Sequence, residues 1–257
     1  MKSTFYAFRS NYSYEEALAL QGLLSSEGYI GLLAFECPET ITFGRSSNPK
    51  QELRVSQSFL QEQEITLLST DRGGNTLYHG PGQLIGFPIV NLKQAFGDAK
   101  AIKRFSEELL MGLAHACAVL GVKSVTTRQD YPGLWTSRGL LASVGINVKD
   151  GYVFHGFYLN VHQSVAQGFG LTHPMGLSDC PITSLEQEGV RLNDVQDVSV
   201  KILPYLSVIQ GELVKNSCRV LSFENNYSNL VSAVSRSQMA IDHIRANMEG
   251  SLSRERN

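Results

Sequence analysis

The chain has 257 residues, of which 42% are apolar and 18% are charged, as is usual for a soluble protein that buries a sizeable core. Its formal net charge of −2 argues against a surface that binds the phosphate backbone of nucleic acids. No apolar run reaches the roughly 18 residues of a membrane-spanning helix, and the N-terminus lacks the apolar core of a secretion signal, so we expect a cytoplasmic protein that uses no membrane.

The cysteines and histidines are scattered along the chain. Cys37, Cys117, Cys180 and Cys218 form no CxxC pair, which is typical of reduced thiols in a cytosolic protein. The histidines show neither the H-x-x-x-H nor the H-E-x-x-H spacing of metal ligands. The sequence therefore implies no metal site.

The first predicted element is a helix that begins after Ser13 and ends near Gly28. Ser13-Tyr-Glu-Glu is a capping-box pattern, and apolar residues follow at helical spacing. Residues 32–43 then predict a strand that Pro38 interrupts, and residues 45–53 predict a polar loop.

The next stretch, DRGGNTLYHGPGQLIGFPIVNL (71–92), is rich in glycine and runs into a strand over residues 82–92. Within that strand Pro88 indicates a sheet edge or a bulge. Gly80, Gly82 and Gly86 lack the G-x-G-x-x-G spacing of a dinucleotide fingerprint, and no Lys-Ser/Thr pair follows as in a P-loop. The stretch therefore predicts neither kind of phosphate site.

A tight turn would explain the glycines of this stretch but would not require Arg72, Tyr78 and His79 beside them. We expect the glycines to let a ligand chain lie against bare backbone. His79 and backbone N–H groups would then face a carbonyl oxygen of that ligand.

A second helix is predicted from residue 101 to residue 120, because apolar residues recur at three-to-four spacing and Gly121 follows. His115 and Cys117 lie on it, where packing explains them best. Residues 194–217, divided by Pro204, and residues 227–248 are also predicted to be helical. We therefore expect a domain over residues 1–190 and a C-terminal helical extension over residues 191–257 packed on it.

Residues 140–148 and 152–161 predict a β-hairpin, since Asp150-Gly151 stands between two alternating apolar runs. With these two residues in the turn, Val148 faces Val153, Ile146 faces His155 and Val144 faces Phe157. Two-residue alternation then predicts one shared face for a set of five side chains: Leu140, Ala142, Val144, His155 and Phe157. His155 would be a single imidazole on an apolar wall, which alone fits a hydrogen-bonded core residue as well as a functional one.

Several stretches resemble, in unbroken order over about residues 13–190, motifs of the octanoyl-[acyl-carrier-protein]:protein octanoyltransferases of lipoate biosynthesis. The glycine-rich stretch is similar to their signature R-G-G-x-x-T-Y-H-G-P-G-Q-L. ECPETITFGRS (36–46) is similar to their E-H-P-x-x-x-T-x-G-R, and YPGLWTSRGLLASVGINV (131–148) is similar to P-G-V-W…K-I-A-S-x-G. FHGFYLNV (154–161) is similar to H-G-x-x-L-N-V, and HPMGLSDCPITSL (173–185) is similar to N-P-C-G…T-S-L. The resemblance implies an α/β fold of the α+β type, a biotin/lipoate-ligase-like curved mixed sheet flanked by helices.

The resemblance also implies which residues border the acyl group. It assigns substrate binding to three segments that comprise Arg72, Gly73, Gly74, Asn75, Thr76, Leu77, Tyr78, His79, Ala142, Ser143, Val144, His155, Gly156 and Phe157. We expect two histidines and bare backbone to border a narrow apolar slot that fits an eight-carbon chain, with Met175 and Leu140 at its mouth.

Members of the family carry the acyl group on a cysteine, and a nearby lysine favours the thiolate. HPMG places Met175 at the cysteine position and GLLASVG places Leu140 at the lysine position, while Leu77 and Cys37 replace a threonine and a histidine of the motifs. A thioether has no proton to lose, and leucine cannot lower the pKa of a thiol. The two losses are consistent, because a buried ammonium without a partner would be costly.

Three outcomes remain open. Cys180, in the same loop as Met175, is the candidate for a relocated nucleophile, although an unassisted thiol with a pKa near ~8.5 is only a few per cent thiolate at neutral pH. Alternatively, the carrier thioester and the acceptor lysine are held together so that the amine attacks directly, with His79 or His155 as base. Otherwise the protein is a catalytically inactive homologue that binds octanoyl or lipoyl groups, or the carrier domains.

A ligase that activates free lipoate with ATP is a further alternative, but it too relies on a lysine at the Leu140 position. We therefore expect an octanoyltransferase of altered mechanism. The donor would be acyl carrier protein, and the acceptors would be lipoyl domains of 2-oxoacid dehydrogenases and the glycine cleavage H protein. The acyl group arrives on the carrier's phosphopantetheine, so no cofactor of the enzyme's own is expected.

Overall fold

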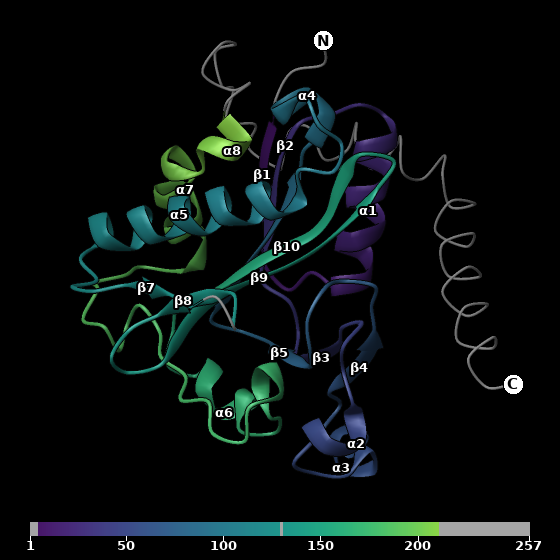
Figure 1. The fold of residues 1–257 in the computed structure, drawn as a ribbon. Helices are drawn as coiled ribbons and strands as arrows, with labels where there is room; N and C mark the ends of the chain where they lie inside the picture. The colour runs from purple at the N-terminus through teal and green to yellow at the C-terminus, as the bar shows by residue number, and fades with distance from the viewer. Residues whose placement is uncertain (1–4, 129–130, 211–257) are drawn as a thin grey trace, which may run out of the picture.

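The computed structural model describes residues 5–128 and 131–210 of the chain (Figure 1). Within this part, the larger of two sheets is mixed and has seven strands in the order β1-β2-β6-β10-β9-β8-β7. These strands are β1 (Phe5–Arg9), β2 (Gly31–Phe35), β6 (Gln83–Ile89), β7 (Thr126–Thr127), β8 (Gly133–Trp135), β9 (Leu140–Lys149) and β10 (Tyr152–Asn160). The smaller sheet has the order β4-β3-β5 and consists of β3 (Thr40–Phe43), β4 (Thr66–Ser69) and β5 (Leu77–His79).

Helices cover both faces of the larger sheet, and Figure 1 shows α5, α7 and α8 grouped on one side with α1 on the other. The longer helices are α1 (Tyr14–Ser26), α5 (Ile102–Leu120) and α7 (Val195–Ile202). The shorter ones are α2 (Pro49–Glu52), α3 (Gln57–Glu62), α4 (Leu92–Phe96), α6 (Val165–Phe169) and α8 (Ser207–Gln210), with the 3-10 turns η1 (Pro174–Gly176) and η2 (Leu203–Tyr205). Two hydrophobic clusters fill the space between the larger sheet and the elements on its two faces. The first joins the sheet to α5, α7 and α8, and the second joins it to α1, α6 and the smaller sheet.

The predicted ends of the two long helices are confirmed. The Ser13 hydroxyl caps α1 by accepting a hydrogen bond from the Glu16 backbone N–H at 3.2 Å. Helix α5 ends at Gly121, whose φ of 111° is a left-handed conformation that glycine adopts without steric cost. Cys117 of α5 is fully buried in the first cluster, as a packing residue should be.

The β9–β10 hairpin has the predicted register. Val148 pairs with Val153, Ile146 with His155 and Val144 with Phe157. Asp150 and Gly151 occupy the turn with φ of 51° and 79°, the two positive values that a type I′ turn requires. The Asp-Gly signal therefore predicted the pairing correctly.

The prediction that five side chains of this hairpin share one face is wrong for two of them. Ala142, Val144 and Phe157 do pack toward α5, in the first cluster. His155, however, has a left-handed backbone with φ of 57°, which turns its imidazole toward α1 on the opposite face. Leu140 also packs in the opposite layer, because a register irregularity between β8 and β9 inserts an extra residue before Ala142.

The α1 residue Gln21 supports the backbone where His155 departs from regular strand geometry. Its side-chain oxygen accepts a hydrogen bond from the His155 N–H at 2.8 Å, and its amide donates to the carbonyls of His155 and Pro88 at 3.0 and 2.9 Å. A buried side-chain amide thus replaces the ladder hydrogen bonds that a neighbouring strand would have made.

Prolines divide the chain differently from expectation in two places. Pro38 does separate residues 32–43, but into β2 and β3, which belong to different sheets. Pro88 was predicted to mark a sheet edge or a bulge; β6 is not an edge strand, since it lies between β2 and β10, but its pairing with β10 stops before Pro88. Pairing of β6 with β10 ends at Gly86, so no β10 carbonyl needs the N–H that Pro88 lacks. Within the predicted polar loop, Pro49 begins the short helix α2.

The first part of the predicted C-terminal extension belongs to the same core as the sheet. Val198 and Ile202 of α7 and Ile209 of α8 are fully or almost fully buried in the first cluster. Pro204 lies in η2, directly after α7, and so divides the predicted helical segment 194–217 as expected, although residues 211–217 lie outside the described residues. The division at residue 190 stays a prediction, and the expected helix over residues 227–248 lies outside the described residues. In the described part of the chain, no helix is both long and apolar enough to cross a bilayer.

Candidate functional site

The Arg72-Gly-Gly turn lies directly against the β9–β10 hairpin. The Gly73 N–H donates to the Ile146 carbonyl of β9 at 3.0 Å. On the hairpin side Gly145 faces the turn, since a Cβ there would lie 3.2 Å from the Gly73 oxygen, and on the other side Gly44, directly after β3, leaves no room for a side chain, since a Cβ there would lie 2.2 Å from the Gly74 oxygen. Two motifs that are distant in the sequence are thereby joined through bare backbone.

A small cavity lies where the three predicted substrate-binding segments meet. From the predicted set, its lining includes Arg72, Leu77, His79, Ser143, Gly156 and Phe157, and it is completed by Tyr14, Ile85, Phe87, Gly145 and Tyr158. Ala142 and Val144 are not part of the lining, because they pack on the α5 side of the sheet. The three segments therefore converge as expected, but β9 contributes Ser143 and Gly145 to the lining and not Ala142 and Val144.

The expectation of an open slot for an eight-carbon chain is contradicted by the volume of this cavity, which is about 10 Å³. That volume holds about one water-sized atom. Aromatic rings fill most of the space: Tyr14 packs edge-on against Phe87 with centroids 5.1 Å apart, and against His79 at 5.3 Å. An acyl chain can enter only if some of these side chains move.

Arg72 is a buried cation held by uncharged groups. Its guanidinium donates to the Thr42 hydroxyl and carbonyl, each at 2.8 Å, and to the Gly73 carbonyl at 3.0 Å. Within the described residues it forms no ion pair, and burial lowers its pKa. The site therefore keeps an uncompensated positive charge, which favours negative charge that develops nearby.

His79 is the centre of a buried hydrogen-bond network. Its Nδ1 lies 2.7 Å from the Gln83 amide oxygen, so this nitrogen carries the proton. Its Nε2 lies 3.1 Å from the Thr42 hydroxyl, which accepts from Arg72 and therefore donates here. Burial and the Arg72 charge lower the pKa of His79 to about 3. A neutral imidazole with both nitrogens engaged is a poor base, so this geometry favours a positioning role.

His155 connects the cavity with the protein surface. Its Nε2 lies 2.7 Å from an Asp71 oxygen, and its Nδ1 lies 3.0 Å from the Tyr14 hydroxyl. The other Asp71 oxygen pairs with Lys149, which is about half exposed, at 2.6 Å. The hydrogen bond from His155 holds the pKa of Asp71 well below its usual range, whereas burial lowers the pKa of His155 itself. A neutral His155 thus donates to Asp71 and accepts from Tyr14, which lines the cavity.

Other residues of the glycine-rich stretch stabilise the fold. Asn75 and Thr76 hydrogen-bond the buried carboxylate of Glu52. The Tyr78 hydroxyl donates to Glu39 at 2.8 Å, away from the cavity. Gly80 faces the Tyr78 ring, since a Cβ there would lie 2.2 Å from the phenol oxygen. Packing of the Tyr78 ring therefore explains the glycine at this position.

Met175 and Leu140 belong to the same hydrophobic cluster as Leu77, but neither is among the residues that line the cavity, so the expectation that they form its mouth is not met. Met175 has φ of 59° and ψ of 17°, a left-handed conformation that is unfavourable for a residue with a side chain. The turn thus keeps a strained geometry of the kind that functional sites often contain, at the position where the motif has a nucleophile. Leu140 is fully buried, which suits an apolar replacement for an ammonium.

The described thiols are all buried and protonated. Burial raises the pKa of Cys37 and of Cys117 to about 12, and that of Cys180 to about 11. Arg128 and Arg54 lower the pKa of Cys180 by less than burial raises it. The prediction of Cys180 as nucleophile stays untested, but its environment disfavours the thiolate that such a role needs.

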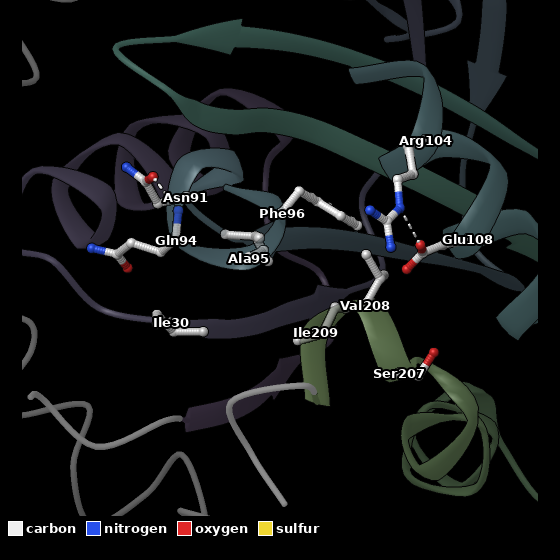
Figure 2. Close-up of a pocket in the computed structure, with 11 residues that line it drawn as sticks. Ile30, Asn91, Gln94, Ala95, Phe96, Arg104, Glu108, Ser207, Val208 and Ile209 are labelled. Atoms are coloured by element: carbon white, nitrogen blue, oxygen red, sulfur yellow. Dashed lines mark hydrogen bonds and ion pairs between the residues drawn. The ribbon is translucent and has the colours of Figure 1, made fainter. Parts of the chain in front are cut away.

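A second hollow, of about 270 Å³, lies between α4, α5 and α8 (Figure 2). The Phe96 and Val208 side chains border it, and the Arg104 guanidinium donates to Glu108 at its rim at 2.8 Å. No residue of the predicted site lines it. It is therefore separate from the cavity at His79.

Three polar residues at or next to the cavity were not identified by sequence patterns: Tyr14, Asp71 and Tyr158. Asp71 opens the glycine-rich stretch, where an acidic residue next to Arg72 was a usable signal. Tyr14 was read as part of a capping box, and Tyr158 stands at a variable position of the H-G-x-x-L-N-V motif. Their roles depend on contacts between distant segments, which no local pattern contains.

Comparison with known proteins identifies the family. The model of the lipoyl protein ligase A/B catalytic domain matches residues 8–207. The octanoyltransferase of Syntrophotalea carbinolica is 37% identical over 179 residues, which cover 68% of this chain and 79% of that protein.

Two solved structures show the same fold. A protein of T. acidophilum described as a putative lipoate protein ligase, with bound lipoic acid, has a TM-score of 0.65 at 10% identity, covering 92% of this chain and 96% of that one. A bipartite lipoate protein ligase from Thermoplasma acidophilum, studied with its E2 lipoyl domain, has a TM-score of 0.59 at 11% identity, covering 91% and 92%. The mixed sheet flanked by helices is thus confirmed, and the chain belongs to the lipoyl protein ligase A/B catalytic domain family.

Proposed function

We propose that the protein is a cytoplasmic octanoyltransferase that moves an octanoyl group from the phosphopantetheine of acyl carrier protein directly to a lysine of a lipoyl domain. The acceptors are the lipoyl domains of 2-oxoacid dehydrogenases and the glycine cleavage H protein. One observation carries the proposal: the three motif segments still converge on one cavity. The described thiols are all buried and protonated, so the proposal does not use a cysteine nucleophile. The relative named octanoyltransferase supports the reaction class.

The direct route follows from the chemistry that Met175 and Leu140 cannot perform. Without a thiolate there is no acyl-enzyme, so the acceptor amine attacks the carrier thioester itself. A C–N bond forms, the C–S bond breaks, and the carrier thiolate takes up a proton. The ammonium of the acceptor lysine must first lose a proton, which requires a base at the cavity.

The Tyr14–His155–Asp71 chain supports that proton transfer. Tyr14 lines the cavity and donates to His155, whose other nitrogen is oriented by the ionised Asp71. Asp71, at the far end of the chain, is itself 40% exposed. A proton released at the cavity can therefore be passed toward solvent through groups that are already hydrogen-bonded, while Arg72 favours the negative charge of the reaction.

Binding of the acyl chain requires a rearrangement of the aromatic rings around Tyr14. Burial of an octanoyl tail contributes about 0.8 kcal/mol per methylene, or roughly 5 kcal/mol for the whole tail. That gain is large enough to offset the rotation of one or two side chains, each of which costs about 0.5–1.5 kcal/mol. The closed cavity is thus compatible with an induced fit by the substrate.

A catalytically inactive binder of the octanoyl group is the second candidate, and the loss of both reactive side chains favours it. One experiment separates the alternatives. The protein is incubated with octanoyl-carrier protein and a lipoyl domain, and all three intact masses are followed. A lipoyl domain whose acceptor lysine is replaced by arginine is the control.

An octanoylated lipoyl domain without an enzyme adduct is the result we expect. An adduct that hydroxylamine removes and that disappears in Cys180→Ala would instead establish the relocated nucleophile. Bound octanoyl-carrier protein with neither product would leave the inactive homologue.

A further inference from the structure

Tyr158 of β10 has a buried hydroxyl without a hydrogen-bond partner. Among the described residues, three buried side-chain oxygens lack a partner, those of Ser25, Ser47 and Tyr158, and of these residues Tyr158 alone lines the cavity at His79. Tyr158 is 2% exposed. A buried hydroxyl that makes no hydrogen bond destabilises a fold, so its retention needs an explanation.

Tyr158 lines the cavity at which the motif segments meet, next to His79. Its ring packs against His79 and Phe169 with centroids 5.9 and 5.8 Å apart. Leu140 and Met175, the positions of the family's lysine and cysteine, belong to the same hydrophobic cluster. Burial raises the pKa of Tyr158 well above its usual value. The group is therefore an O–H donor at any physiological pH.

The other polar side chains that line the cavity already make hydrogen bonds, including Ser143, whose hydroxyl donates to the Pro132 carbonyl. Arg72 donates to Thr42 and Gly73, both nitrogens of His79 have partners, and the Tyr14 hydroxyl contacts His155. The cavity of about 10 Å³ has room for one atom such as a carbonyl oxygen. A donor that makes no competing hydrogen bond breaks none when that oxygen arrives.

We propose that the Tyr158 hydroxyl donates a hydrogen bond to the carbonyl oxygen of the octanoyl thioester and stabilises the oxyanion that forms when the acceptor amine attacks. This inference rests on the proposed octanoyl transfer. The amine nitrogen bonds to the carbonyl carbon, the oxygen gains negative charge, and the C–S bond then breaks as the charge returns. Tyr158 keeps its proton throughout, so it acts by hydrogen bonding and not as an acid.

The test compares Tyr158→Phe with Tyr6→Phe, a matched loss of one buried phenol oxygen. Tyr6 lies on the α5 side of the sheet, where its hydroxyl is hydrogen-bonded to Ser199. We expect Tyr158→Phe to unfold at the same denaturant concentration as the wild type or a higher one, and to lose about 10²-fold or more in kcat with little change in KM. Tyr6→Phe should show the reverse, with lower stability and unchanged kcat. Wild-type kcat in Tyr158→Phe would overturn the inference.

A second measurement separates this inference from the proposed function. The carbonyl stretch of bound, isotope-labelled S-octanoyl-pantetheine is recorded by infrared difference spectroscopy in the wild type and in Tyr158→Phe. A shift to lower frequency in the wild type that disappears in the variant supports the hydrogen bond, even if no transfer occurs. Identical frequencies in the two proteins contradict it. Absence of turnover in the wild type would count against the proposed function alone.

Discussion

The imidazole of His155 is held against the carboxylate of Asp71 at 2.7 Å, although the two residues belong to motifs 84 positions apart. The left-handed backbone of His155 makes this contact possible by turning the side chain out of its regular strand orientation. Asp71 in turn selects the tautomer in which His155 accepts from Tyr14. This pair joins the glycine-rich stretch to the hairpin and continues a chain of hydrogen bonds from the cavity-lining Tyr14 to the partly exposed Asp71.

Asp71→Asn should lower kcat for octanoyl transfer by about 10²-fold, because a neutral carboxamide cannot stabilise the positive charge of His155 when it takes up a proton, as the ionised Asp71 does. The carrier protein should bind with unchanged affinity. Lys149→Met is the matched control, since it removes the exposed partner of Asp71 and leaves His155 in place. An exposed ion pair contributes only about 0.2–1 kcal/mol, so this variant should transfer nearly as fast as the wild type. Equal losses in both variants would argue against a role for the His155 contact.

Met175→Cys should restore an acyl-enzyme. The Met175 backbone already has the left-handed geometry of this turn, so a thiol there would face the same space as the thioether. Incubation with octanoyl-carrier protein should give an octanoyl adduct that hydroxylamine removes, and addition of Leu140→Lys should speed its formation by favouring the thiolate. If neither variant is acylated, Met175 does not occupy the nucleophile position.

Cys180→Ala should leave the transfer rate within a factor of about two, because burial keeps this thiol protonated and direct attack does not use it. Stability should fall slightly through the lost packing. The measurement is a steady-state rate with the lipoyl domain as acceptor. A large loss of kcat without a loss of fold would instead identify Cys180 as the relocated nucleophile.

The buried histidines predict that the protein loses stability in mild acid. His79 has its pKa lowered to about 3 in the folded protein, against about 6.5 when unfolded, so below pH 6.5 the unfolded chain binds more protons. The stabilisation is complete above pH 6.5 and declines as the pH falls toward 3. From pH 7.5 to pH 5.5 the free energy of unfolding should decrease by about 1.4 kcal/mol through His79.

Urea unfolding at these two pH values tests this, with His79→Gln as the comparison. Glutamine cannot be protonated, so the variant should lose about 1.4 kcal/mol less than the wild type over the same interval, whatever its stability at pH 7.5. The same pH dependence in both proteins would show that His79 is not the group responsible.

The sequence was sufficient where a local signal determines the structure. Asp150-Gly151 predicted the hairpin and its register, and Ser13 and Gly121 predicted helix ends, because turn and cap geometry depend on the residues themselves. The orientation of His155 could not be predicted, since a left-handed histidine is stabilised by Gln21, a residue from another element. Alternation therefore assigned it to the wrong face.

The candidate site, like the fold, could be predicted only where a local motif determines it. Motif order brought Arg72, His79 and Ser143 to one cavity, as expected. The filling of that cavity by Tyr14 and Phe87 was not foreseen, because it depends on how α1 and β6 pack across the layer. Similarly, Gly80 accommodates the Tyr78 ring, whereas its sequence context suggested a ligand.

The most direct test of an unassisted transfer is the release of free thiol from octanoyl-carrier protein under single-turnover conditions, with and without a lipoyl domain. We expect no burst of carrier thiol when the protein and octanoyl-carrier protein are mixed alone, and stoichiometric release once the acceptor lysine is present. One equivalent of thiol released without acceptor would mean that the protein itself is acylated, and would contradict the direct mechanism.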